Sequence, residues 1–375
     1  MANTFNLGDG NWATKEDSLL GYNSENNNYK PLPFDFSRAS SATRVNKDGL
    51  IETVGNNVPR IDYKDDSKGA LLLEPSRSNI ITYSEDFSQN SWTKTNSTIS
   101  SNQDISPDGT NNASLFSAVG EGRLRINFSP PSTERSFSIW VKSYNNTQSN
   151  GLLTFSGLNS ISFTTTNEWQ RITTTRDVAG DTFKCSLRTT DSSLLVWGAQ
   201  LEQGSYATSY IPTQGGAVTR LADSCNNAGN EQVINSTEGV LYAEISALES
   251  GGVNRYISLS DNTTSNRIQL VLSGSNANRI SVSGSGLTSI NYDSYNQTDM
   301  NKVALKYSTS GVKLFVNGLE VGSNNDNATW PSGTFTTLDF ALWNQSSVPF
   351  YGKVKDLKLY STALTDQELQ ALTTI

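Results

Sequence analysis

Aromatic and amide side chains gather at two places near the C-terminal end of the sequence. The stretch SNNDNATWPSG contains the first group, which comprises Asn324, Asn325, Asp326, Asn327 and Trp330. The second group comprises Trp343, Asn344 and Gln345. Indole rings stack on the apolar face of a pyranose, while amides and carboxylates satisfy its hydroxyl groups. Both groups are therefore candidate glycan-binding loops. In the alternative, Trp330 packs on the rim of the fold and the Asn residues satisfy turns.

Histidine is absent from the 375 residues, and this restricts the catalysis available to the chain. A Ser-His-Asp or Cys-His nucleophile is excluded, and so is a zinc site with histidine ligands. An enzyme with this sequence would have to rely on carboxylates, Lys or Tyr.

Composition limits the expected partners and compartment. The formal net charge is −8 and Lys and Arg form no cluster, so nucleic acid is not an expected partner. No stretch approaches the ~20 apolar residues that span a bilayer, so no membrane insertion is expected. The N-terminus MANTFNLGDGNWATKED lacks the regions of a signal peptide, and we expect a soluble protein made in a cytoplasm. Cys185 and Cys225 are expected to be free thiols, because two cysteines make no disulfide framework.

Alternation of apolar and polar residues dominates the chain from about residue 84 onwards. RLRINFS and SFSIWVKS are examples, and in GVKLFV the residues Val312, Leu314 and Val316 fall on one face. A period of two, with turns rich in Asn, Gly and Ser, is typical of antiparallel sheets that have one packed face. Asn317-Gly318 between two such runs predicts a two-residue hairpin, because both turn positions favour positive φ.

These patterns predict an all-β protein with two antiparallel β-sandwiches, of jelly-roll or concanavalin-like type, in tandem. An irregular N-terminal segment, residues 1–83, precedes a first sandwich over residues 84–222 and a second over residues 226–375. Because the irregular segment alternates poorly, it is expected to fold against the rest of the chain or against a neighbouring subunit.

A single short helix is predicted at the C-terminus, in STALTDQELQALTTI. Thr365 is a good N-cap, and Glu368 three residues later completes a capping box. Leu364 and Leu369 have the spacing of a hydrophobic staple. The helix is expected to close one side of the second sandwich.

The stretch WGAQLEQGSYATSYIPTQGG, residues 197–216, is interpreted as a seam between the sandwiches. Its start alternates like a core strand. Tyr206 and Tyr210 are expected to hold an extended segment against the first sandwich, with Pro212 stopping regular pairing. Their role is therefore interpreted as structural.

The N-terminal segment also contains three arginines, Arg38, Arg44 and Arg60. Their expected partners are the nearby carboxylates Asp35, Glu52 and Asp62. Isolated surface pairs are weak, so the value of such pairs would lie in fixing the register between subunits.

Several stretches resemble structural proteins of tailed bacteriophages. FDFSRASSATRVNKDGLIETVGNNVPRIDY, residues 34–63, and GALLLEPSRSNIITYSEDFSQNSWTK, residues 69–94, resemble a module that recurs in them. WGAQLEQGSYATSYIPTQGGAVTRLAD, residues 197–223, is similar to the end of the carbohydrate-binding-module-like sandwich that follows this module. GVKLFVNGLEVGS and YGKVKDLKLYSTALTDQELQAL resemble a laminin-G-type, concanavalin-A-like sandwich. The opening GDGNWATKEDSLLGY resembles appendage proteins of crAss-like and other phages of Bacteroidetes.

This resemblance implies a structural component of the virion, a head or tail fibre or another appendage. The N-terminal segment would then bind other virion proteins and support a homo-oligomer, with a trimer favoured and a dimer next. The sandwiches would contact glycans of the host surface. Two alternatives remain open, a tailspike-type enzyme that degrades polysaccharide and a purely architectural connector or decoration protein.

Concanavalin-A-like folds also host glycoside hydrolases, whose Glu-x-Asp-x-(x)-Glu strand motif places its carboxylates on one face. No Glu of this chain is followed by Asp two residues later. The nearest look-alike runs from Glu244 to Glu249, has Ser at the middle position and directs its two carboxylates to opposite faces. We therefore expect no enzymatic activity.

Laminin-G-like domains often hold a calcium ion with loop carboxylates and carbonyls, so the resemblance implies Ca²⁺ as a cofactor to test. The candidate ligands are Asp261, Asn262 and Asp326. The chain has no dense acidic loop of the EF-hand type, and no other cofactor is expected.

Overall fold

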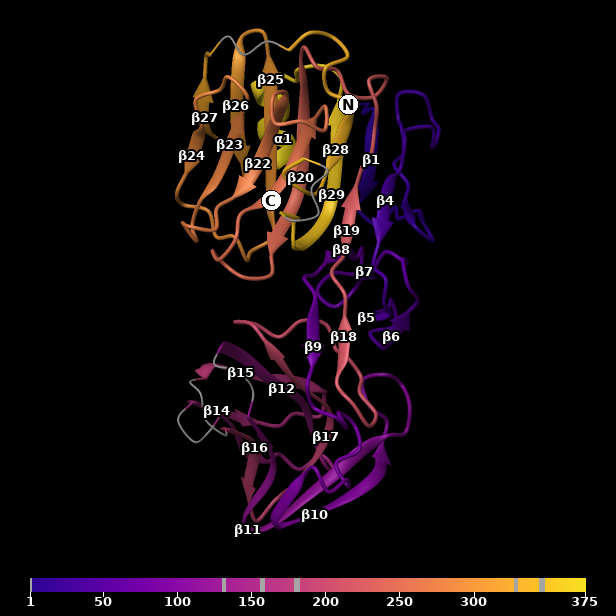
Figure 1. The fold of residues 1–375 in the computed structure, drawn as a ribbon, viewed down its shortest axis with the longest axis vertical. Coiled ribbons are helices and arrows are strands. Elements are labelled where there is room, and N and C mark those ends of the chain that lie inside the picture. Colours follow the sequence, from indigo (N-terminus) through magenta and orange to yellow (C-terminus); the bar gives the residue numbers. More distant parts are fainter. Residues whose placement is uncertain (1, 130–132, 156–158, 179–182, 327–329, 344–347) are drawn as a thin grey trace. The chain divides into compact units, whose positions relative to one another are not determined.

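The computed structural model describes residues 2–129, 133–155, 159–178, 183–326, 330–343 and 348–375. Within these residues the chain forms 29 strands and one α-helix, which confirms the prediction of an all-β protein (Figure 1). It divides into two compact units. Unit 1 consists of Met1–Ser41, Val54–Pro75 and Ala222–Ile375, and unit 2 consists of Ala42–Thr53 and Ser76–Leu221.

This division differs from the expected order of segments. Residues 1–83 do not form a separate N-terminal body, because most of them belong to unit 1 together with the second sandwich. Residues 42–53 and the stretch from Ser76 onwards belong to unit 2 instead. The physical reason is strand pairing. The short apolar runs of residues 1–83 are too isolated to form a core of their own, so they pair with strands of a sheet that the rest of unit 1 forms.

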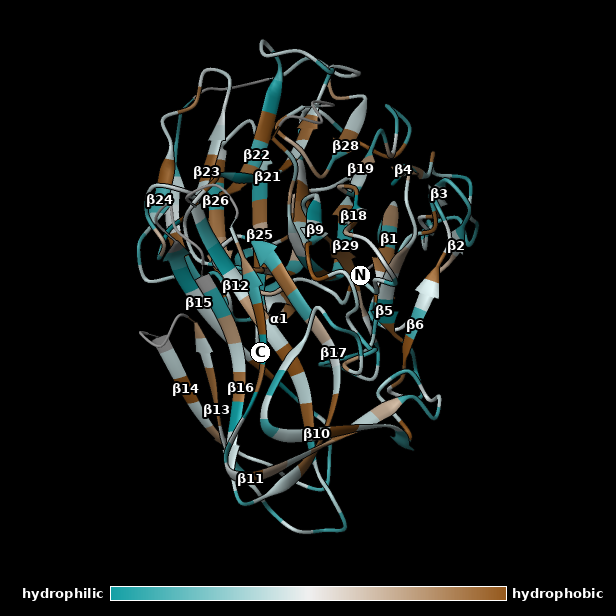
Figure 2. Cartoon of the chain, turned by 60° about the horizontal axis from the view of Figure 1, so that its bottom comes forward, coloured by the Kyte–Doolittle hydropathy of each residue, from teal (hydrophilic) through white to brown (hydrophobic). Residues whose placement is uncertain are grey.

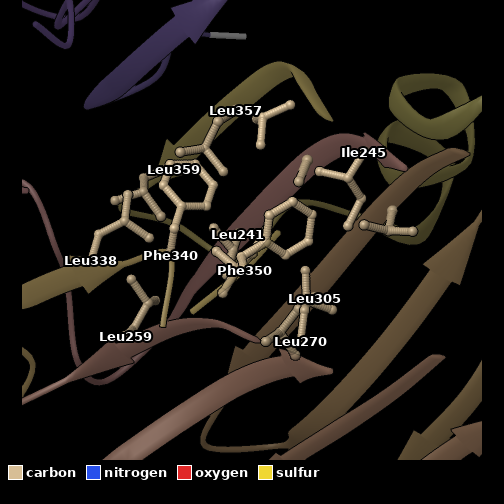
Figure 3. Packing of buried hydrophobic residues seen from close by; sticks show 14 of the residues in the cluster. Leu241, Ile245, Leu259, Leu270, Leu305, Leu338, Phe340, Phe350, Leu357 and Leu359 are labelled. Carbon is tan, nitrogen blue, oxygen red and sulfur yellow. The ribbon is translucent and has the colours of Figure 1, made fainter. Parts of the chain in front are cut away.

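Unit 1 is a sandwich of two antiparallel sheets. The larger sheet follows the order β27 (Leu319–Asn324), β26 (Gly311–Val316), β25 (Asn301–Ser308), β20 (Gly239–Ala247), β29 (Gly352–Tyr360), β8 (Ala70–Leu73) and β7 (Ile61–Asp62), and β1 (Phe5–Gly8) also pairs with β29. The other sheet follows the order β24 (Ile290–Tyr292), β23 (Ile280–Gly284), β22 (Arg267–Leu272), β21 (Arg255–Ser260) and β28 (Thr337–Asp339). Side chains from β20, β29, β21 and β22 point toward one another in the shared core, part of which Figure 3 shows.

The N-terminal part of unit 1 supplies both strands and core. Phe5 lies opposite Leu359 in the β1–β29 pair, and Leu71 lies opposite Val354 in the β8–β29 pair. A small sheet of β19 (Ser224–Asn226), β4 (Phe34–Ser37), β3 (Ser18–Leu19) and β2 (Thr14–Lys15) adds to it. Eight apolar residues from this part belong to the same core as the C-terminal strands: Phe5, Leu7, Leu19, Phe34, Phe36, Ile61, Leu71 and Leu73.

Four buried ionised side chains hold the N-terminal part of unit 1 to the start of its C-terminal part. Asp223 accepts hydrogen bonds from Nη1 of Arg38 at 3.0 Å, from Nη2 of Arg60 and from the backbone N of Glu74 at 2.8 Å. Nη1 of Arg60 also donates to Glu74 at 2.7 Å. Burial lowers the pKa of Arg60, but the charges of Asp223 and Glu74 outweigh it and raise the pKa above its usual range. This set is called the Asp223 network below.

The expected partners of these arginines are therefore corrected. Arg38 and Arg60 pair with Asp223 and Glu74 in the interior, rather than with Asp35 and Asp62. The reason is that the strand pairing of unit 1 brings residue 223 beside residues 38 and 60, which sequence spacing does not show.

The expected pair of Arg44 and Glu52 is confirmed. Its Nε donates to Oε1 of Glu52 at 2.7 Å, across the hairpin of β5 (Ala42–Val45) and β6 (Ile51–Val54).

The two local signals near the C-terminus are confirmed. Asn317 and Gly318 have φ values of 49° and 85° and join β26 to β27. Helix α1 (Asp366–Thr373) starts after a Thr365 capping box that includes Glu368. Leu364 and Leu369 pack with the apolar side chains on the outer face of the larger sheet, so the helix covers that face as expected.

Unit 2 is built on one strongly curled antiparallel sheet. Its order is β14 (Asn159–Thr164), β13 (Asn150–Phe155), β16 (Phe183–Thr190), β11 (Ala113–Phe128), β17 (Ser193–Gln203), β12 (Thr133–Ser143) and β15 (Gln170–Val178), and β10 (Thr93–Asp104) also pairs with β11. The end strands β14 and β15 contact each other, so the sheet closes round its core. Figure 2 shows that hydrophilic and hydrophobic residues both occur along these strands.

The seam of residues 197–216 belongs to unit 2, and its start is part of β17 in the unit 2 sheet, as interpreted. Trp197 and Tyr210 are buried together with Trp140, with the Trp197 and Tyr210 ring centroids 4.6 Å apart. Oη of Tyr210 lies 2.7 Å from Oγ of Ser84, which ties the extended segment to the chain before β10. The segment after β17, residues 204–216, is called the strap below. Tyr210 therefore has the structural role that was expected.

The two cysteines, Cys185 and Cys225, are free and buried. Among the described residues, no helix has the length and apolar character to cross a membrane.

Candidate functional site

Trp330 does not lie on the surface. Its side chain is only 6% exposed and packs in the core of unit 1, with its ring centroid 4.9 Å from Phe335 and 6.5 Å from Tyr307. A buried ring presents no face to a sugar. The expectation of a glycan platform at Trp330 is therefore corrected in favour of the packing alternative, because the ring completes the core between neighbouring aromatic side chains.

The remaining described residues of the first cluster hold a loop in place. Asp326 accepts hydrogen bonds from the backbone N of Thr288 and from Nδ2 of Asn324, each at 2.8 Å. These bonds, led by the one from Thr288, lower the pKa of Asp326. Asn325 is exposed beside it, while Asn327 lies outside the described residues.

The second cluster is only partly described, because Asn344 and Gln345 lie outside the described residues. Trp343 is half-buried, and the guanidinium carbon of Arg267 lies 5.2 Å from its ring centroid. A cation over the indole makes a favourable contact and occupies part of the surface on which a sugar would stack. The structure therefore gives no support for a sugar platform at Trp343.

The candidate calcium ligands do not form one site. Asp261 accepts from the backbone N of Thr263 at 2.9 Å and from Asn266 at 2.7 Å, so it stabilises its own turn. Asn262 adopts φ 64° in the same turn, whereas Asp326 is bonded to a different loop. In the described parts of the chain, no three or more carboxylate or thiol groups gather closely enough to hold a metal ion. The residues present therefore do not fit the calcium ion that the resemblance implies.

A hollow of about 950 Å³ opens on the surface of unit 2, at the strands β13 and β14. We call it the β13–β14 hollow. Its volume falls within the range of small-molecule sites. Amide and hydroxyl groups, an arginine and two apolar side chains contribute to its lining, including Gln148, Asn150, Leu152, Ser162, Phe163, Thr164 and Arg188.

Phe163 is the aromatic side chain of this lining. It lies opposite Gly151 in the β13–β14 pair. A Cβ atom added to Gly151 would lie 2.3 Å from Cζ of Phe163, so the ring lies across the glycine and leaves no room for a side chain there. Because Gly151 has no side chain, the Phe163 ring can pack over its backbone in the neighbouring strand.

Polar groups share the lining of the hollow with Phe163, which is itself half-buried and packs against the hydrophobic core of unit 2. Thr164 donates its hydroxyl to Oδ1 of Asn150 at 2.7 Å, which orients the Asn150 amide. Glu121 at the edge of the hollow accepts from Nη2 of Arg123 at 2.7 Å, and Nη1 of Arg188 lies 3.5 Å from it. Asp191 also lines the hollow, so its recognition groups are amides, hydroxyls, two carboxylates, one arginine and one ring.

The aromatic platform was not among the residues selected from the sequence. NGLLTF, residues 150–155, was not singled out in the sequence, and the register that sets Gly151 opposite Phe163 is not visible in it. The glycine inside a strand was the available signal, because such a glycine often marks a place where another group approaches the backbone closely.

Residues 234–370 match a family model described as the concanavalin A-like lectin/glucanases superfamily. Among solved structures, the CBM40 module of the Ruminococcus gnavus IT-sialidase bound to α2,3-sialyllactose is similar at 19% identity, with 36% of this chain and 83% of that chain covered and a TM-score of 0.32. Domain 4 of the Geobacillus stearothermophilus arabinanase AbnA, in complex with arabinotriose, is similar at 16% identity, with coverage of 46% and 84% and a TM-score of 0.34. No curated protein matches the chain. The matched family and the two facing sheets agree that the C-terminal part of unit 1 is a concanavalin A-like sandwich.

Proposed function

We propose that this protein is a non-enzymatic structural component of a bacteriophage virion, a fibre or appendage that binds glycans of the host surface. The match of residues 234–370 to a lectin superfamily supports a carbohydrate-binding role. The resemblance of residues 34–94 and 197–223 to phage structural proteins supports the virion. Glu244 and Glu249 pair with different cations, Lys355 and Arg255, which fits the absence of a hydrolase motif.

The observation that carries glycan binding is the β13–β14 hollow, whose lining combines the half-buried Phe163 with amide and hydroxyl side chains. A pyranose has one face of C–H groups and a rim of hydroxyls, so it fits a hollow lined by an aromatic side chain together with amide and hydroxyl side chains. Packing against Gly151 and the core of unit 2 restricts the Phe163 side chain, and this lowers the entropy cost of binding.

Phe163→Ala is expected to weaken glycan binding about tenfold or more, because stacking and apolar burial together contribute ~1–3 kcal/mol. A glycan array with the full-length protein identifies ligands, and calorimetry with the best soluble one measures the affinity of each variant. Gly151→Val is expected to weaken binding similarly, because it displaces the ring without removing it. Phe163→Tyr and Trp343→Ala are the controls and are expected to bind like the wild type. Unchanged affinity in Phe163→Ala, with an unchanged melting temperature, would refute the site.

A virion fibre is a symmetric assembly, so the purified chain is expected to form a homo-oligomer, with a trimer ahead of a dimer. Multi-angle light scattering at micromolar concentration measures this directly. A stable monomer there contradicts the proposed fibre.

A further inference from the structure

Unit 2 has a second hollow, of about 650 Å³, where the strap passes the turn before β10 and the strands β10 and β11. We call it the strap hollow. Its lining includes Tyr83, Glu85, Asp86, Asn102, Asn112 and Gln214. Amides, hydroxyls, carboxylates and one phenol ring thus line a space large enough for a sugar unit.

Glu85 and Asn112 form a fixed pair in this lining. Nδ2 of Asn112 donates to Oε2 of Glu85 at 3.1 Å, and Oη of Tyr210 donates to Oε1 at 2.9 Å. Tyr210 is itself buried against Trp140 and Trp197. The hydroxyl that holds the Glu85 carboxylate therefore belongs to a side chain that is fixed by packing. The orientation of Glu85 is therefore set before any ligand arrives.

Glu85 has acceptor capacity left. A carboxylate offers about four lone-pair positions, and these two hydrogen bonds use two of them. The remaining acceptor positions of Glu85 at the hollow favour a ligand that brings several O–H donors, and neighbouring hydroxyls of a saccharide do so.

The charges of the hollow disfavour an acidic ligand. Glu85 and Asp86 both line it, and no Lys or Arg does so among the described residues. Lys94 donates its ammonium to the backbone carbonyls of Ser88 and Gln89. Acidic glycans are usually held by Arg or Lys, and like charges in a half-buried site cost binding energy.

We propose that the strap hollow is a second glycan site, which takes an uncharged saccharide through adjacent hydroxyls and rejects acidic ones, with Glu85 as the residue that determines this specificity. The inference deepens the proposed glycan-binding function and rests on it. It assigns a ligand class and a second site, so a polysaccharide chain can be held by unit 2 at two places.

The test uses the full-length chain with Phe163→Ala, in which binding at the β13–β14 hollow is weakened. Calorimetry measures its affinity for a panel of neutral oligosaccharides of glucose, galactose and mannose, and for oligogalacturonates as the acidic counterparts of the galactose series. Phe163→Ala is expected to retain measurable binding to a neutral member. Adding Glu85→Gln is expected to weaken this binding about tenfold, because one hydroxyl loses its ionic acceptor. Adding Glu134→Gln, at an exposed carboxylate of the same unit outside the hollow, is expected to change nothing.

Each outcome separates the two proposals. If the wild type binds glycans and Phe163→Ala binds no neutral oligosaccharide, the strap hollow is not a site, while the proposed function stands. If oligogalacturonates bind Phe163→Ala as well as neutral chains do, the ligand class is wrong. If the wild type binds no glycan, both fail.

Stability supplies a readout that distinguishes a recognition role from a structural one. Burial, with the charge of Asp108 adding to it, raises the pKa of Glu85, despite the opposing hydrogen bond from Tyr210. A carboxylate with a raised pKa favours folding at acidic pH, and this contribution is lost as the pH rises through the folded-state pKa. Asp86, Asp108 and Tyr210 are the titratable groups around it. The melting temperature of Glu85→Gln relative to the wild type is therefore expected to increase from acidic to neutral pH, and a decrease would indicate a structural carboxylate.

Discussion

Asp223→Ala is expected to destabilise unit 1 by about 3–5 kcal/mol, the usual cost of removing one partner from a buried ion pair. Asp223 is fully shielded and neutralises both Arg38 and Arg60. Without it, two buried guanidinium groups have only Glu74 as an ionised partner within the Asp223 network. Domains are typically stable by only ~5–15 kcal/mol, so the loss is large enough to unfold much of unit 1 at moderate temperature.

Calorimetric melting of the full-length protein measures this effect. The transition of unit 1 is expected to move to lower temperature, while that of unit 2 stays in place. Asp293→Ala is the matched control in unit 1, because it removes a carboxylate that pairs with Arg279 on the surface. Exposed pairs contribute ~0–1 kcal/mol, so this control is expected to shift the transition little. Equal shifts in the two variants would show that the Asp223 network has no special role.

The fold was largely predictable wherever its signals are local. The period of two identified the strands, Asn317-Gly318 identified a hairpin, and Thr365 with Glu368 identified the helix start. Each of these depends on residues a few positions apart. Strand pairs and ion pairs between residues far apart in sequence were not predictable. β1 pairs with β29 near the other end of the sequence, and Arg38 forms an ion pair with Asp223. The expected boundary at residue 83 differs from the structure for this reason.

The candidate site was predicted less well, because residue type alone does not show exposure. A tryptophan among asparagines suits both a sugar site and a sandwich rim, and the burial of Trp330 decides between them. Phe163 was overlooked because its suitability depends on Gly151 across a strand pair. Glu85 was overlooked because its orientation depends on Tyr210, which lies 125 residues away along the chain.

A protein consisting of residues 222–375 alone is expected not to fold, although it contains the whole stretch that matches the lectin superfamily. β29 would lose both β1 and β8, and one of its edges would have no partner. The core would lose eight apolar side chains, including Phe34, which packs on Phe340 with ring centroids 4.9 Å apart. Each such side chain contributes ~1.5–3 kcal/mol, so the total loss is on the order of 10 kcal/mol and exceeds the stability of many domains.

The control for this truncation is a chain in which residues 1–75 are joined to residues 222–375 by a short Gly/Ser linker. The backbone N of Asp223 donates to the carbonyl O of Glu74 at 3.0 Å, so a few residues suffice to connect the two pieces. This linked chain keeps every strand of the unit 1 sandwich together with the Asp223 network, and it is expected to unfold cooperatively in urea. Far-UV circular dichroism and urea titration compare the two proteins at equal concentration. If residues 222–375 unfold cooperatively at the same urea midpoint as the linked chain, the N-terminal strands do not contribute to the stability of the sandwich. If only the shorter protein loses its unfolding transition, the N-terminal strands are part of the core.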